Sequence, residues 1–177
     1  MTAQHRDPFS IDVGVPRPAY PRTGCEGVLV AILRTLSDDR GLELIDPPTR
    51  CVRRYDIHEL ILTDDADAKP GARVDRAAYL GFVEFDRGGV ISAGDTVTID
   101  DAPVGEIAGF DETHMPNHIN ILLRGPNRIP GTERGLALGS RVKFVPRPVP
   151  DAAAIQARAS VRTESVQLPS SSVRGNR

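Results

Sequence analysis

VGEIAGFDETHMPNHINILLRG, residues 104–125, is the stretch that best defines the fold of this chain of 177 residues. Residues 104–110 combine branched and aromatic side chains with two glycines, which permit a bulge or a close backbone approach, so they predict a strand. The apolar run 118–123 predicts a second strand. The polar residues 111–117 therefore predict an irregular link that joins the two strands.

Outward from this stretch, other short apolar runs are separated by glycine, proline and aspartate turns. They predict strands at 27–33, 42–45, 52–63, 78–85, 95–99 and 141–145. The turn at 38–41 suggests that the first two runs form a hairpin. Run 52–63 fits a helix or a strand, and its β-branched ends favour a strand.

The number and spacing of these strands predict an all-β protein, a small closed β-barrel, because no long amphipathic helix separates them. ISAGDTVTI (91–99) and LALGSRVKF (136–144) share one form, in which a glycine-polar turn leads into an alternating strand. Glycine suits such a turn because it tolerates positive φ.

A chain of this length favours one domain with tails, here a β-barrel over residues 25–146. Residues 1–24 are rich in proline and predict an extended or disordered arm. Residues 147–177 predict a flexible tail, in which 151–159 could form a short helix with Asp151 as its cap.

The net charge is −2 and the pI is about 6.1, which gives no general attraction to nucleic acid. No apolar run is long enough for a membrane span, and the N-terminus lacks the apolar core of a secretory signal. We therefore expect a cytoplasmic protein without a nucleic-acid or membrane partner. Cys25 and Cys51 are expected to be free thiols. The sequence is compatible with a homo-oligomer.

The link between the two strands carries most of the groups that could do chemistry. We expect a ligand to contact Asp111, Glu112, His114, Asn117 and His118. Glu112, His114 and His118 are also candidate catalytic residues and candidate ligands of a divalent metal, with Asp111 or Glu84 in support, since carboxylate and imidazole bind such ions well. In an extended segment Glu112 and His114 would share one face. The alternative is that these polar residues only cap a turn.

A second group lies in run 52–63. Asp56, His58 and Glu59 could form an acid/base group, because imidazole beside carboxylate is a common arrangement for proton transfer. The alternative is a solvated strand face. No glycine-rich phosphate loop, nucleophile elbow or HExxH motif is present in the sequence.

The order of motifs over residues 94–144 is similar to that of the glucitol/sorbitol-specific IIA component of the bacterial phosphotransferase system. The motifs are Gly94, VGEIA (104–108), the link, HINI (118–121), Gly125, PGT (130–132) and VKF (142–144). The resemblance implies a small closed β-barrel. It also implies a phosphoacceptor histidine upstream, yet residues 76–89, RAAYLGFVEFDRGG, contain no histidine, and His118 corresponds to a later position of the family. A phosphoryl carrier needs a nucleophilic imidazole, so a shared barrel with a changed task is expected.

These observations predict a small-molecule-binding β-barrel whose ligand is polar or sugar-like and binds near the 111–118 link without phosphoryl transfer. The first alternative is a small metal-dependent or acid/base enzyme that uses the same link. The others are a divergent phosphocarrier and a scaffold protein acting through its arm and tail. No cofactor is expected, apart from the divalent metal of the first alternative.

Overall fold

A computed structural model describes residues 21–148, and over this range the protein is all-β, as predicted. No helix in this range has the length and hydropathy needed to cross a bilayer. Most of the predicted arm (1–24) and the predicted helix (151–159) lie outside the described residues. The strands are β1 (Cys25–Ile32), β2 (Leu36–Ser37), β3 (Leu42–Glu43), β4 (Thr49–Val52), β5 (Ile57–Thr63), β6 (Arg73–Val74), β7 (Ala77–Phe85), β8 (Gly89–Ser92), β9 (Thr96–Ile99), β10 (Ala102–Asp111), β11 (Asn120–Arg124) and β12 (Arg141–Val145).

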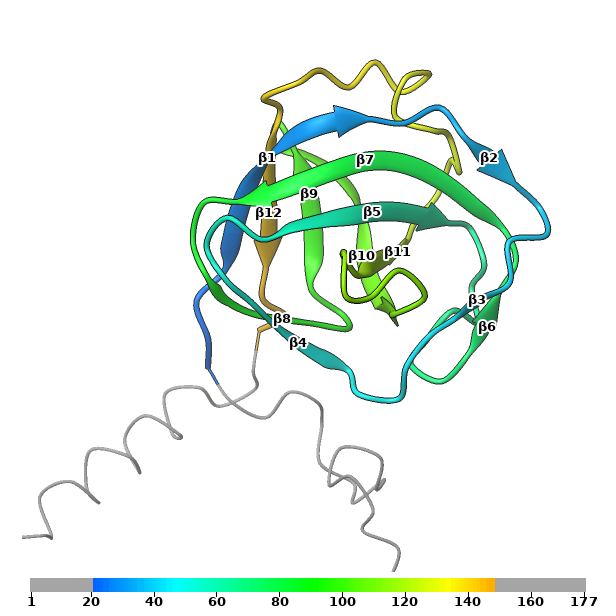
Figure 1. Cartoon of the computed structure of the whole chain (residues 1–177), viewed down its shortest axis with the longest axis horizontal. Helices are drawn as coiled ribbons and strands as arrows, with labels where there is room; N and C mark the ends of the chain where they lie inside the picture. The colour runs from blue at the N-terminus through cyan, green and yellow to red at the C-terminus, as the bar shows by residue number, and fades with distance from the viewer. Residues whose placement is uncertain (1–20, 149–177) are drawn as a thin grey trace, which may run out of the picture.

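Eight of these strands form one strongly curved sheet in the order β1-β12-β9-β10-β11-β5-β7-β2, and β1 also pairs with β7 (Figure 1). β10 and β11 pair antiparallel, which confirms the two strands predicted around the link. The pairing register shifts between Ile107 and Gly109 and between Pro103 and Gly105, so bulges lie beside both glycines of β10. β11 and β5 pair in parallel, and this pairing connects two segments that are remote in the sequence.

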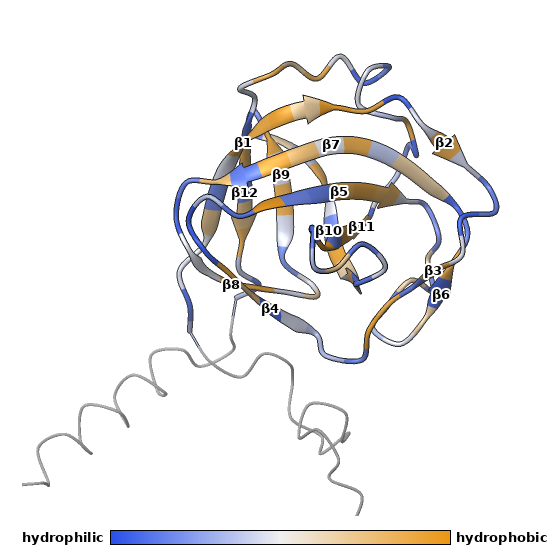
Figure 2. Ribbon diagram, in the orientation of Figure 1, coloured by the Kyte–Doolittle hydropathy of each residue, from blue (hydrophilic) through white to orange (hydrophobic). Residues whose placement is uncertain are grey.

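Alternation along the strands divides the apolar side chains between two clusters, because successive residues of a strand point to opposite faces. In Figure 2 the strands carry much of the orange, apolar colour. The larger cluster contains Leu60, Leu62 and Phe110. The smaller cluster contains Ile61 and Leu122, and it is covered by side chains of β3 and β6. The outer face of β5, β10 and β11 is therefore partly buried under a second small sheet.

The predicted hairpin between runs 27–33 and 42–45 is wrong. β1 pairs with β12 and β7, whereas Leu42 pairs with Val74 of β6. Leu42 and Val74 are fully buried, and both belong to the smaller cluster. Burial of these side chains on the outer face outweighs the local turn at 38–41.

Other local predictions have mixed outcomes. Run 52–63 is a strand in its second half, as β5, but it starts with the end of β4 and a turn. The shared turns of 91–99 and 136–144 are confirmed, since Gly94 has φ of 88° and Gly139 has φ of 82°. Cys25 and Cys51 are free, as expected, the first buried and the second exposed.

Candidate functional site

A row of polar residues crosses three neighbouring strands at the end of β10 that adjoins the link. Glu59 of β5 pairs with Asn120 of β11, and Asn120 pairs with Asp111 of β10. All three are buried. Burial of polar groups costs free energy unless they find partners, so this row needs a physical explanation.

Glu59 points to the outer face of the sheet. Ile61, two residues further along β5, belongs to the smaller cluster, whereas the adjacent Leu60 belongs to the larger one. Glu59 therefore shares the face of Ile61. Across the strand pair from Glu59 lies Phe82 of β7.

The link folds over this face as a series of turns. The Asn117 and His118 backbone N–H groups both donate to the His114 carbonyl oxygen, at 2.9 and 3.3 Å. The second of these bonds closes one helical turn, which places His114 and His118 on the same side of the link. The His118 ring also packs edge-on against Phe82, with ring centroids 5.0 Å apart.

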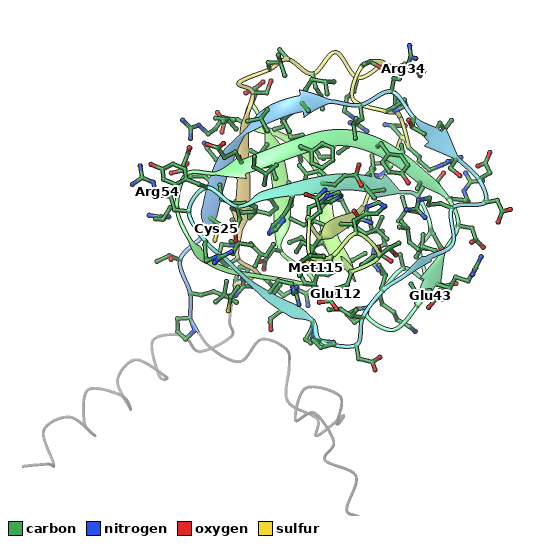
Figure 3. The ribbon with its side chains drawn as sticks, viewed as in Figure 1. Cys25, Arg34, Glu43, Arg54, Glu112 and Met115 are labelled. Atoms are coloured by element: carbon green, nitrogen blue, oxygen red, sulfur yellow. The ribbon has the colours of Figure 1, made fainter. Side chains whose placement is uncertain are left out.

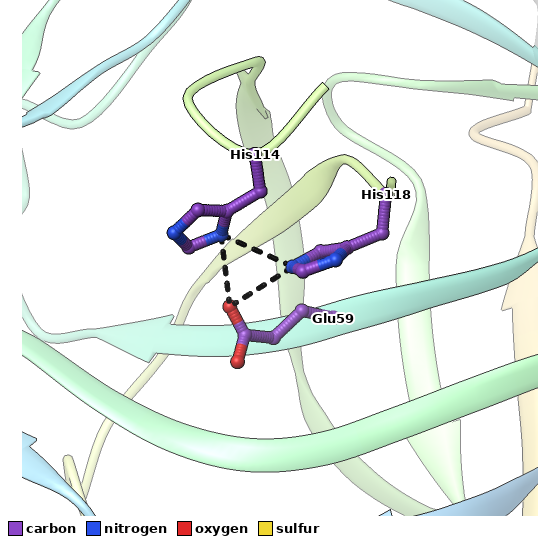
Figure 4. A group of neighbouring side chains, drawn as sticks. All are labelled: Glu59, His114 and His118. Carbon is purple, nitrogen blue, oxygen red and sulfur yellow. Dashed lines mark hydrogen bonds and ion pairs between the residues drawn. The ribbon is translucent and has the colours of Figure 1, made fainter. Parts of the chain in front are cut away.

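Three donor atoms converge where the link meets β5 (Figure 4). His114 Nδ1 lies 3.1 Å from His118 Nε2. Glu59 Oε2 lies 3.8 Å from the His118 nitrogen and 4.0 Å from the His114 nitrogen. The Glu59 and His118 side chains are 7% and 11% exposed and that of His114 is 38% exposed, so solvent reaches the group from the His114 side.

Glu59 Oε2 is buried and has no hydrogen-bond partner within residues 21–148. Burial raises the pKa of the Glu59 carboxyl, while the His114 and Arg40 charges oppose this shift. Burial, together with the charge of His114, lowers the pKa of His118. A lowered imidazole pKa favours the neutral ring, which is the form that binds a metal.

The geometry fits a divalent transition-metal ion. A triangle with sides of 3.1, 3.8 and 4.0 Å has a circumradius of about 2.1 Å, so one point lies at zinc-ligand distance from all three donors. Two imidazoles and one carboxylate also match the ligands of catalytic zinc sites and of mononuclear iron sites. The three side chains could therefore hold such an ion.

Asp111 anchors this part of the molecule. Its carboxylate accepts hydrogen bonds from Asn120 Nδ2 at 2.8 Å and from the Thr113 backbone N–H and hydroxyl at 3.1 and 2.9 Å. It also accepts from the Glu43 backbone N–H at 3.1 Å, which joins β3 to the site. Asp111 thus positions the link and Asn120, and both of its oxygens already accept hydrogen bonds.

The predicted pairing of Glu112 with His114 is wrong because the link is not extended. The Glu112 carboxylate forms an ion pair with Arg50 at 2.6 Å. Figure 3 shows Glu112 and Met115 on the link, and both are exposed. Asn117 is also exposed.

The other predicted residues lie apart from the three donors. Glu84 on β7 pairs with Val28 and Ile57. The predicted group of Asp56, His58 and Glu59 is divided, because His58 and Glu59 point to opposite faces of β5. His58 Nε2 lies 4.0 Å from Asp56, and the His58 ring packs edge-on against Phe85.

The sequence did not predict the roles of two residues of the site. Glu59 was expected to act with His58, and Asn120 was not expected in the site. A carboxylate at the start of the apolar run LILT is the available signal for Glu59, since a charged residue next to buried apolar ones needs a partner. Asn120 gives a weaker signal because polar residues at strand starts are common.

The raised pKa of Glu59 predicts a pH dependence of stability in protein stripped of metal by chelation. A raised folded-state pKa contributes stability that is fully present below the unfolded value and is lost as pH rises through the folded value. The free energy of unfolding of the wild type should therefore fall relative to that of Glu59→Gln as pH rises above about 4.5. Urea unfolding of both proteins at several pH values measures this difference. A difference that does not change with pH would contradict the prediction.

Comparison with known proteins gives one match. Residues 19–145 match the model of a family described as "Family of unknown function (DUF6917)". No curated protein and no solved structure matches the chain.

Proposed function

The chain belongs to the family of unknown function DUF6917, and we propose that it binds one divalent transition-metal ion through Glu59, His114 and His118. The ion would join β5 to the link. Since the family description names no activity, this proposal rests on the geometry of the site.

One observation carries the proposal, namely the buried oxygen Glu59 Oε2 that faces two imidazole nitrogens and lacks a hydrogen-bond partner in the described part of the chain. A hydrogen bond to either imidazole would bring the atoms to about 2.7–3.2 Å. At 3.8 and 4.0 Å the oxygen is too far for such a bond, whereas an ion between the three donors satisfies all of them.

The exposed side of His114 supports a role beyond structure. An ion held by three protein donors keeps coordination positions for water or for an oxygen-donor ligand, as catalytic zinc sites do. The small polar ligand predicted at the link would bind there. The ion would supply Lewis-acid chemistry to that ligand, while Glu59 would bind the ion as a carboxylate.

Metal titration of Glu59→Gln and wild type tests the proposal. Untagged protein in a Cys51→Ser background, which removes an exposed thiol that could bind zinc, is analysed for its metal content and then titrated with Zn²⁺ against a coloured chelator. We expect one equivalent of bound zinc in the parent protein. Glu59→Gln should bind at least about 100-fold more weakly because a charged donor is lost.

Glu112→Gln is the matched control. Glu112 is the carboxylate that the sequence favoured, it lies on the link, and its partner is Arg50. This variant should bind zinc as the parent does. Binding of less than one equivalent by the parent, or equal affinities of the Glu59 and Glu112 variants, would refute the proposal.

We also infer that the main sheet is a closed β-barrel. The inference is supported by β7, which pairs with β5 on one side and with β1 on the other, while β1 also pairs with β12. The phosphocarrier alternative stays a prediction, and labelling with phosphoenolpyruvate and the general phosphotransfer proteins tests it. A cytoplasmic location is likewise an expectation from the sequence.

A further inference from the structure

We propose that the side-chain oxygen of Asn120 is a fourth protein donor to this ion and determines which ions the site accepts. The inference rests on the proposed function, since it concerns the same site. It is carried by the orientation of the Asn120 amide and by the distance between Asn120 Oδ1 and His114 Nδ1.

The amide orientation of Asn120 is determined by Asp111. A carboxylate only accepts hydrogen bonds, so the Asn120 group that lies 2.8 Å from Asp111 Oδ1 is the amide nitrogen. The amide oxygen is therefore the group that faces the site. It lies 3.3 Å from His114 Nδ1.

His114 Nδ1 cannot donate a hydrogen bond to Asn120 and coordinate a metal ion at the same time. In the metal-free protein, His114 Nδ1–H can donate to Asn120 Oδ1. Once Nδ1 coordinates an ion it carries no proton, and the Asn120 oxygen, in a fully buried residue, loses its donor. Coordination of Asn120 Oδ1 by the same ion restores a partner, because a buried acceptor without one is costly.

The distances match a shared coordination sphere. Neighbouring donors on an ion with bonds of about 2.0–2.1 Å lie about 2.8–3.4 Å apart, and the shorter distances belong to an ion that keeps a fifth or sixth position for a small ligand. His114 Nδ1 lies 3.1 Å from His118 Nε2 and 3.3 Å from Asn120 Oδ1, so both distances fall within this range.

A fourth donor of this kind changes the expected ion preference. Amide oxygens suit Mg²⁺, Ca²⁺ and Mn²⁺, whereas imidazoles suit zinc, iron, nickel and copper. Two nitrogens with two oxygens favour ions such as Zn²⁺, Fe²⁺ and Mn²⁺ over the soft Cu⁺.

Replacement of Asn120 by leucine removes the oxygen and nearly keeps the side-chain volume. We expect Asn120→Leu to bind Zn²⁺ and Mn²⁺ about 10–100-fold more weakly than the parent. The visible absorption of bound Co²⁺ should also change in position and intensity, because it reports the number and geometry of the donors. A residue that only supported the fold would leave this spectrum unchanged.

Thr113→Val is the matched control, since it removes another hydrogen bond to Asp111 without removing a candidate donor. It should leave the affinities and the cobalt spectrum as in the parent. Far-UV circular dichroism checks that the metal-free variants are folded, and Asn120→Ser, whose hydroxyl is too short to reach the ion, replaces Asn120→Leu if leucine prevents folding. Equal affinities and equal spectra for the Asn120 variant and the parent would overturn the inference, whereas an absence of metal binding by the parent would refute the proposed function itself.

Discussion

Replacement of Asp95 by asparagine is expected to lower the free energy of unfolding by about 3–5 kcal/mol. Asp95 is fully buried and both of its oxygens accept from the Arg22 guanidinium, whose side chain is 6% exposed. It also accepts from the backbone N–H groups of Ser92 and Arg147. Asparagine has nearly the same shape but leaves the buried guanidinium without a neutralising charge. Urea unfolding at constant pH measures the loss.

Asp101→Asn is the control for this prediction. Asp101 is also paired with a cation, Lys143 at 2.6 Å, but its side chain is 80% exposed. Its φ of 65° is readily adopted by asparagine. Little change in stability is expected there, because exposed ion pairs contribute little. Equal losses of unfolding free energy in the two variants would show that the buried Asp95 ion pair contributes no more to stability than the exposed Asp101 pair.

The strand pattern of this chain could be predicted where alternation is strong. β10, β11 and the link between them follow directly from the apolar runs on either side of DETHMPN, and their bulges lie beside Gly105 and Gly109. The strands that were not predicted, β2, β4, β6 and β8, have two to four residues each. Runs this short carry too little periodicity to be separated from turns.

Only the two histidines of the candidate site, which are close in sequence, could be predicted. His114 and His118 are four residues apart, and one turn of the link brings their rings together. Glu59 reaches them through the parallel pairing of β5 with β11, which no local pattern encodes. Sequence proximity favoured Glu112 instead, but Arg50 lies near enough to pair with it.

The resemblance to the phosphotransferase family is an expectation from the sequence, and it would not locate the whole candidate site. Its motifs lie within residues 94–144, a range that includes His114, His118 and Asn120 but not Glu59. The buried carboxylate comes from a strand upstream of these motifs. A site that depends on Glu59 is thus a property of the whole sheet and cannot be inferred from residues 94–144 alone.

Zinc is expected to stabilise the protein, and replacement of His118 by phenylalanine should abolish this effect. An ion that binds only the folded state adds about 2.7 kcal/mol to the free energy of unfolding when it is present at 100 times its Kd. His118 supplies one of the three donors, and phenylalanine keeps an aromatic ring against Phe82 without a nitrogen. Urea unfolding of each protein with and without zinc gives the increment directly.

His58→Phe is the control, because it removes a partly buried histidine from the opposite face of β5. Its metal-free stability can differ from that of the wild type, but its zinc increment should be the same, since His58 is not one of the three donors. The comparison of increments thus separates a lost ligand from a damaged core. A zinc increment that survives in His118→Phe, or that disappears equally in both variants, would mean that the ion binds elsewhere or that the two histidines act only through the fold.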